Sequence, residues 1–259
     1  MKQIISISSV FIGLVIGAGF ASGREIFEYF SIPSSTDLTG IAIATISFGA
    51  ICYITMHLAQ KTKCRDFDTL ISHLSGRFSP AVKLFMFSYM FCGFFVMMSA
   101  CGALTSQILN ISPRYGIWLL ALVCFFVFSF DLKGLVTFNA ILVPLMASGM
   151  LFVCLSSAFS ALPAFSALTF LKKNPLLSAL CYVSYNTITA GAVLVPLSTT
   201  ATKKQLAASS ALSGALLGTL IFVAWSCMNL YSDRLFFMEI PLLDHAQDSG
   251  QIATIIYTL

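Results

Sequence analysis

Long apolar runs separated by short polar segments dominate this chain. A transmembrane helix needs about 20 apolar residues, and runs of that kind predict seven spans and the start of an eighth. The spans are expected at residues 3–30, 38–59, 81–109, 115–130, 135–159, 175–200 and 205–231, with an apolar start at 251–259. The pattern therefore predicts an all-α polytopic membrane protein, with one transmembrane domain over residues 1–259.

The first predicted span is interrupted by small residues. Gly17, Gly19 and Gly23 fall within seven residues, together with Ala18 and Ser22. Glycine weakens a helix by about 1 kcal/mol relative to alanine. An unwound turn in a bilayer needs protein, water, an ion or a substrate to satisfy its backbone groups. We therefore expect a discontinuous helix of the kind found in secondary transporters. A cleaved signal peptide and glycines used only for close helix packing are the alternatives.

The sixth predicted span carries a second interruption. Asn186, Thr187, Thr189 and Gly191 place polar or flexible residues near its middle, and Pro196 follows. Proline removes a backbone donor and blocks the hydrogen bond one turn back. Interrupted segments at corresponding places in two halves of a chain point to a transport site. Alternatively, these polar side chains serve only as interhelical hydrogen-bonding groups.

Two further positions are candidates for the site. Ser99 belongs to a stripe of small residues on the third span, which lines either a cavity or a packing groove. Glu25 follows the first break, and an ionisable group at membrane depth is a functional hypothesis. We consider Glu25 for proton or cation coupling, with a plain surface ion pair as the alternative.

In the connection after the second span, Phe67, Leu70, Ile71 and Leu74 have helical spacing and predict an amphipathic interfacial helix.

Composition narrows the function classes. Of the 259 residues, 9% are charged, against about 25% in soluble domains. The net charge of +4 is dispersed, which argues against nucleic-acid binding. The eight cysteines form no CxxC pair and the three histidines lie far apart, so no metal site is predicted. No HExxH or GxSxG motif occurs, and we expect no enzyme activity. A cytoplasmic N-terminus would put nine of the 14 Lys and Arg residues inside, which favours that orientation.

The segment GAGFASGREI, residues 17–26, resembles the first-helix signature of the YkvI-type membrane proteins. This largely uncharacterised bacterial family is placed with the amino acid–polyamine–organocation superfamily, whose fold is LeuT-like. The resemblance implies two inverted five-helix repeats, the first at about 1–159 and a partial second at about 175–259. It also implies a substrate between the unwound parts of helices 1 and 6. The positions that would bind it are Gly17, Ala18, Gly19, Phe20, Ser22, Asn186, Thr187 and Thr189, with Ser99 facing them from helix 3.

The resemblance implies a secondary transporter in the inner (plasma) membrane that works by alternating access. Positive half-helix ends favour an anionic group, and unwound carbonyls favour a cation. An amino acid or a related zwitterion meets both demands. No cofactor is expected beyond a coupling ion, Na⁺ or H⁺, and the oligomeric state stays open. Because helices 8 to 10 of the family pattern are missing, we also expect a shortened form. A non-transporting or partner-dependent fragment is therefore the alternative function.

Overall fold

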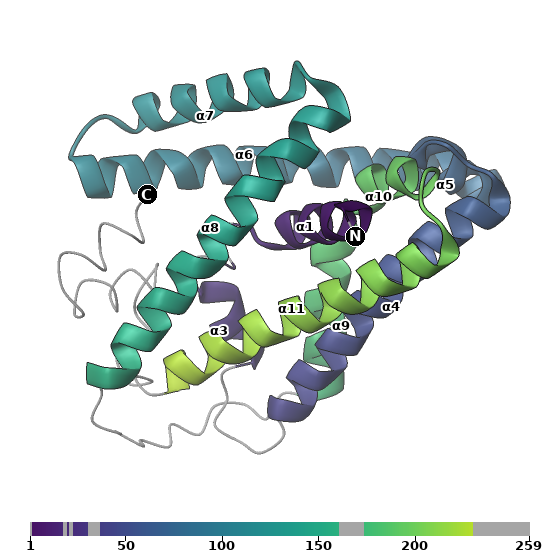
Figure 1. Ribbon diagram of the computed structural model, residues 1–259. Helices are drawn as coiled ribbons and strands as arrows, with labels where there is room; N and C mark the ends of the chain where they lie inside the picture. The colour runs from purple at the N-terminus through teal and green to yellow at the C-terminus, as the bar shows by residue number, and fades with distance from the viewer. Residues whose placement is uncertain (1, 18–19, 21–22, 31–36, 161–173, 230–259) are drawn as a thin grey trace.

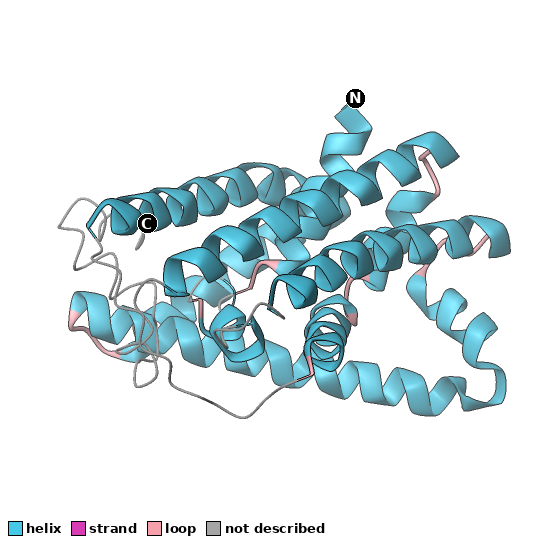
Figure 2. Ribbon diagram, turned by 90° about the horizontal axis from the view of Figure 1, so that it is seen from below, coloured by secondary structure: helices cyan, strands magenta, loops and turns pink. Residues whose placement is uncertain are grey.

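The computed structural model describes residues 2–17, 20, 23–30, 37–160 and 174–229. All regular structure in those residues is helical, and short turns connect the helices (Figure 2). The elements are α1 (Lys2–Val15), α3 (Arg24–Phe30), α4 (Asp37–Thr62), α5 (Phe67–Ser75), a 3-10 turn (Gly76–Phe78), α6 (Ser79–Leu109), α7 (Pro113–Phe128), α8 (Asp131–Ser160), α9 (Pro175–Thr187), α10 (Gly191–Ser198) and α11 (Lys203–Asn229).

Each predicted span coincides with one helix or with a pair of helices, so the all-α prediction is confirmed. By length and composition, three helical segments of the described residues suffice to cross a membrane: Leu38–Thr62, Phe67–Ser106 and Lys203–Cys227. The bent pair α9 and α10 makes a fourth if it counts as one span. Seven spans and a LeuT-like arrangement stay predictions, and the expected start of an eighth span lies outside the described residues.

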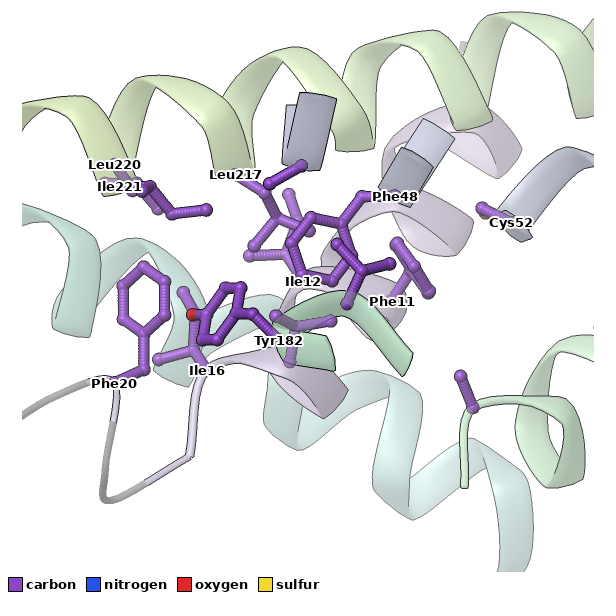
Figure 3. Packing of buried hydrophobic residues seen from close by; sticks show 14 of the residues in the cluster. Phe11, Ile12, Ile16, Phe20, Phe48, Cys52, Tyr182, Leu217, Leu220 and Ile221 are labelled. Atoms are coloured by element: carbon purple, nitrogen blue, oxygen red, sulfur yellow. The ribbon is translucent and has the colours of Figure 1, made fainter. Parts of the chain in front are cut away.

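The core is a cluster of apolar side chains between α1, α4, α9 and α11 (Figure 1). Phe11, Phe48 and Tyr182 are fully buried and meet with Leu217 and Ile221 (Figure 3). The rings of Phe11 and Phe48 lie 6.4 Å apart, and those of Phe48 and Tyr182 lie 5.9 Å apart, both edge to face. This arrangement is favourable for aromatic pairs. The core therefore holds the N-terminal helix against the second half of the chain.

Helices α4 and α11 form the most extensive helix pair of the described elements. They approach closely because small residues line the contact. A Cβ atom on Gly214 would lie 2.8 Å from the Thr45 carbonyl oxygen and 3.1 Å from Gly49 Cα. Gly218 follows one turn later and packs against the Thr45 side chain. This small-xxx-small spacing lets helix backbones make close van der Waals contact in a membrane.

Helices α6 and α7 lie side by side along one edge of the molecule (Figure 1) and carry large exposed apolar side chains. Phe85, Phe91, Trp118 and Phe125 are each more than half exposed. Such a surface is typical of contact with lipid rather than with water. It agrees with the prediction of a membrane protein.

The helix predicted at residues 67–74 is present as α5, and its position at the membrane interface stays a prediction. Leu70 and Ile71 are buried, whereas Leu74 is exposed. Thus α5 packs through a narrower apolar face than its spacing predicted. Asp66 caps its first turn, because one carboxylate oxygen accepts the Thr69 backbone N–H at 2.8 Å and the Thr69 hydroxyl at 2.7 Å. Near the middle of the chain, a turn at Ser129 and Phe130 separates α7 from α8, which begins at Asp131, four residues before the predicted start of the fifth span.

Replacing Gly214 with leucine should lower the free energy of unfolding in detergent by about 1–3 kcal/mol, since the new side chain meets backbone that cannot move aside. Gly93→Leu on α6 is the matched control, because no described heavy atom lies within 4 Å of a Cβ there. We expect it to change stability by less than about 0.5 kcal/mol. Equal losses in both variants would contradict close packing of α4 on α11.

The Asp66 cap makes a pH-dependent contribution to stability. The hydrogen bonds from the Thr69 side chain and backbone hold the pKa of this carboxyl below its ordinary value. The stabilisation is therefore present above the unfolded pKa of about 3.9 and is lost as pH falls through the lowered folded value. Asp66→Ala should lower Tm at about pH 7 and have less effect at about pH 3. A Tm difference that is independent of pH would contradict a carboxylate cap.

Candidate functional site

The first break lies between α1 and α3. The Gly17 amide donates to the Val15 carbonyl at 2.9 Å in a tight turn that ends the α1 ladder. Gly23 has φ +77°, a left-handed conformation that glycine adopts without strain. Its amide donates to Phe20 at 3.0 Å and its carbonyl accepts the Phe27 amide at 3.0 Å, which starts α3. The predicted interruption of the first helix is therefore confirmed.

The second break separates α9 from α10 at residues 188–190, where the two helices bend by 67°. The Thr187 carbonyl accepts the Ala190 amide at 3.0 Å, and the Thr189 carbonyl accepts the Ala192 amide at 3.2 Å. Pro196, which the sequence suggested as part of the break, lies inside α10 instead. The polar residues thus predicted the position of the break correctly, whereas Pro196 does not mark it.

Side chains of neighbouring helices donate to carbonyl groups of the broken helices. The Ser178 hydroxyl donates to the Tyr29 carbonyl at 2.6 Å, and the Trp225 indole donates to the Phe30 carbonyl at 2.9 Å. These two bonds hold the end of α3 against α9 and α11. On α9, the Tyr89 hydroxyl from α6 donates to the Tyr185 carbonyl at 2.9 Å.

Glu25 brings the two breaks together. This half-buried side chain on α3 lies near the Tyr185 phenol and the Asn186 side chain at the end of α9. Asn186 also donates to the Tyr182 carbonyl at 3.0 Å within α9. Two of the predicted site residues, Glu25 and Asn186, therefore meet across the junction of α3 and α9.

Three tyrosines surround this contact. The ring centroids of Tyr29 and Tyr182 are 5.3 Å apart, those of Tyr29 and Tyr185 are 5.9 Å apart, and those of Tyr182 and Tyr185 are also 5.9 Å apart. Figure 3 shows the Tyr182 hydroxyl on the side where Phe20 and Ile16 lie. The sequence analysis missed these tyrosines. Their signal was the spacing of Tyr182, Tyr185 and Asn186 on one helix face, and of Tyr29 one turn after Glu25.

The other predicted residues are placed as follows. The Thr187 hydroxyl donates to the Val183 carbonyl at 2.7 Å, so it is occupied within its own helix. Thr189 lies half-buried in the turn between α9 and α10, and Phe20 is fully buried. Ala18, Gly19 and Ser22 lie outside the described residues.

On α6, the side chain beside the first break is that of Met97. A Cβ atom on Gly17 would lie 3.2 Å from Met97 Cε. Ser99 is exposed and about 200° around the helix from Met97. Within the described ranges, no three His, Cys, Asp or Glu side chains are grouped to hold a metal ion.

Comparison with known proteins found two relatives in Bacillus subtilis (strain 168). The uncharacterized protein YyaD is 32% identical over 146 residues, which are 56% of this chain and 42% of YyaD. The uncharacterized membrane protein YkvI is 27% identical over 256 residues, which are 96% of this chain and 73% of YkvI. The matched part thus spans less than half of YyaD. No family model and no solved structure matches the chain.

The homology with YkvI covers nearly the whole chain, including the segment at residues 17–26 on which the sequence resemblance rested. This homology does not show a superfamily or a LeuT-like fold, and both stay predictions. The apolar helices of the described residues agree with homology to a membrane protein. The chain is therefore a multi-pass membrane protein that is distantly homologous to the uncharacterized membrane protein YkvI.

Proposed function

We propose that this protein is a secondary transporter of a small solute, an amino acid or a related zwitterion, and that α1–α3 and α9–α10 form the solute site. The observation that carries this proposal is the packing of α3 on α9, where the Ser178 hydroxyl donates to the Tyr29 carbonyl at 2.6 Å and the Tyr29 ring stacks on the Tyr185 ring. Helix breaks in a membrane protein concentrate backbone groups and half-helix ends where a polar solute can replace water. A single broken helix would not enclose a solute from two sides.

The breaks also supply a means of movement. The turn at residues 188–190 joins two rigid helices at an angle of 67°. The turn after Val15 similarly separates α1 from α3. Changes of backbone angles in such short turns tilt one half-helix against the other, as alternating access requires. We propose a plasma-membrane location with a cytoplasmic N-terminus, and coupling to Na⁺ or H⁺ with Glu25 as the coupling group.

A transport assay with variants of the first break tests this proposal. The whole chain, reconstituted into proteoliposomes, is given a mixture of the common amino acids, and the internal amino acids are measured by mass spectrometry. We expect uptake of one or more amino acids by the wild type. Gly17→Leu should reduce that uptake at least about tenfold, since the new side chain fills the break beside Met97.

Gly93→Leu is the transport control, because its added side chain meets open space on the same α6 helix that carries Met97. It should keep uptake near the wild-type rate. Both variants should keep a cooperative thermal unfolding transition, because the Met97 side chain can move away from residue 17. Wild-type uptake by Gly17→Leu would remove the first break from the site. A folded wild-type protein that takes up no amino acid would favour the alternative, a non-transporting or partner-dependent membrane protein.

A further inference from the structure

Two buried polar atoms at the junction of the breaks have no hydrogen-bond partner among the described residues: Glu25 Oε2 and Tyr182 Oη. The Tyr182 side chain is fully buried. Buried polar atoms without partners are costly and uncommon in native proteins. Both side chains belong to the junction of α3 and α9, since Glu25 precedes Tyr29 by one helical turn and the Tyr29 ring centroid lies 5.3 Å from that of Tyr182. Together they indicate the position of a group that completes both sets of hydrogen bonds.

The chemistry around these atoms selects the charge of that group. The Glu25 carboxylate lies near the Tyr185 phenol and the Asn186 side chain, and its Oε2 atom is buried without a hydrogen-bond partner. The rings of Tyr29 and Tyr185 are stacked, with planes 24° apart, and the Tyr182 ring meets both of them. The faces of aromatic rings carry partial negative charge and attract organic cations. A carboxylate beside three phenol rings is therefore complementary to a positive group.

We propose that Glu25 and Tyr182, enclosed by the rings of Tyr29 and Tyr185, bind the protonated primary amine of the transported solute. One ammonium N–H donates to Glu25 Oε2 and a second donates to Tyr182 Oη. This assignment rests on the proposed function, because it takes the junction of the breaks as the solute site. A quaternary ammonium has no N–H to donate, and a metal ion would require more oxygen ligands than a carboxylate and two phenols. The requirement for N–H donors therefore distinguishes this site from a general cation site.

Ligand-observed NMR titration of the whole chain in lipid nanodiscs tests the assignment. The probes are propylammonium, tetramethylammonium and propionate, which differ in N–H donors and in charge. We expect saturable binding of propylammonium, binding of tetramethylammonium weaker by at least about tenfold, and no binding of propionate. Sodium chloride at equal ionic strength serves as the competitor that reveals a metal-ion site.

Two conservative variants isolate the recognition groups. Glu25→Gln keeps the size of the side chain, and Tyr185→Phe keeps the ring but removes the hydroxyl near Glu25. Loss of the carboxylate should weaken propylammonium binding about 10- to 100-fold, and Tyr185→Phe should weaken it by a smaller factor. Glu28→Gln, an exposed position on the same helix, should retain affinity within about threefold. Circular dichroism establishes that each variant is folded.

Unchanged affinity in Glu25→Gln, or equal binding of both ammonium probes, would each overturn the amine assignment. These results are separable from the transport proposal. Amino acid uptake without propylammonium binding would remove the amine site and leave transport intact. Specific propylammonium binding without amino acid uptake would support the amine site and contradict the transport function.

Discussion

The backbone carbonyls at the ends of the broken helices impose the main constraint on this structure. In a bilayer these groups have no water to bond with, and each unsatisfied group costs several kcal/mol. The structure meets the constraint with side chains from other helices. Ser178 and Trp225 donate to the last carbonyls of α3. Gln60 on α4 donates to the carbonyl of Ser198, the last residue of α10, at 2.8 Å and to that of Ala201 at 2.6 Å. The outer ends of both half-helices are thus held by the surrounding helices.

The same constraint explains how rigid and adaptable parts are divided. Helices α4 and α11 approach through Gly49, Gly214 and Gly218 and form a close-packed pair. Trp225 on α11 and Gln60 on α4 then reach out from that pair to the ends of α3 and α10. At the centre, between α3 and α9, the polar atoms are not all satisfied. A fixed frame around an incompletely bonded junction is the arrangement that a solute site requires.

The sequence predicted the helices and both breaks, but only part of the candidate solute site. The glycines at 17–23 and the polar residues at 186–191 are local features of the sequence, and such features predict the conformation of the local backbone. The contacts of Glu25 depend on how α3 packs on α9, so the sequence could name Glu25 and Asn186 but not their meeting. Tyr182 and Tyr185 went unnoticed because tyrosine in an apolar helix is ordinary. Ser99 stays a prediction, because a stripe of small residues does not indicate which face of α6 meets α1.

If the two broken helices meet at Glu25 and Tyr185, these side chains are coupled energetically, and a double-mutant cycle on the free energy of unfolding measures that coupling. Glu25→Gln, Tyr185→Phe and the double variant are unfolded in detergent micelles, with Glu28→Gln in place of Glu25→Gln as the control cycle. We expect a coupling energy of about 0.5–3 kcal/mol between Glu25 and Tyr185, and additivity within about 0.5 kcal/mol in the control cycle. Additive effects of Glu25→Gln and Tyr185→Phe would contradict it, because the two helix breaks would then not be in contact.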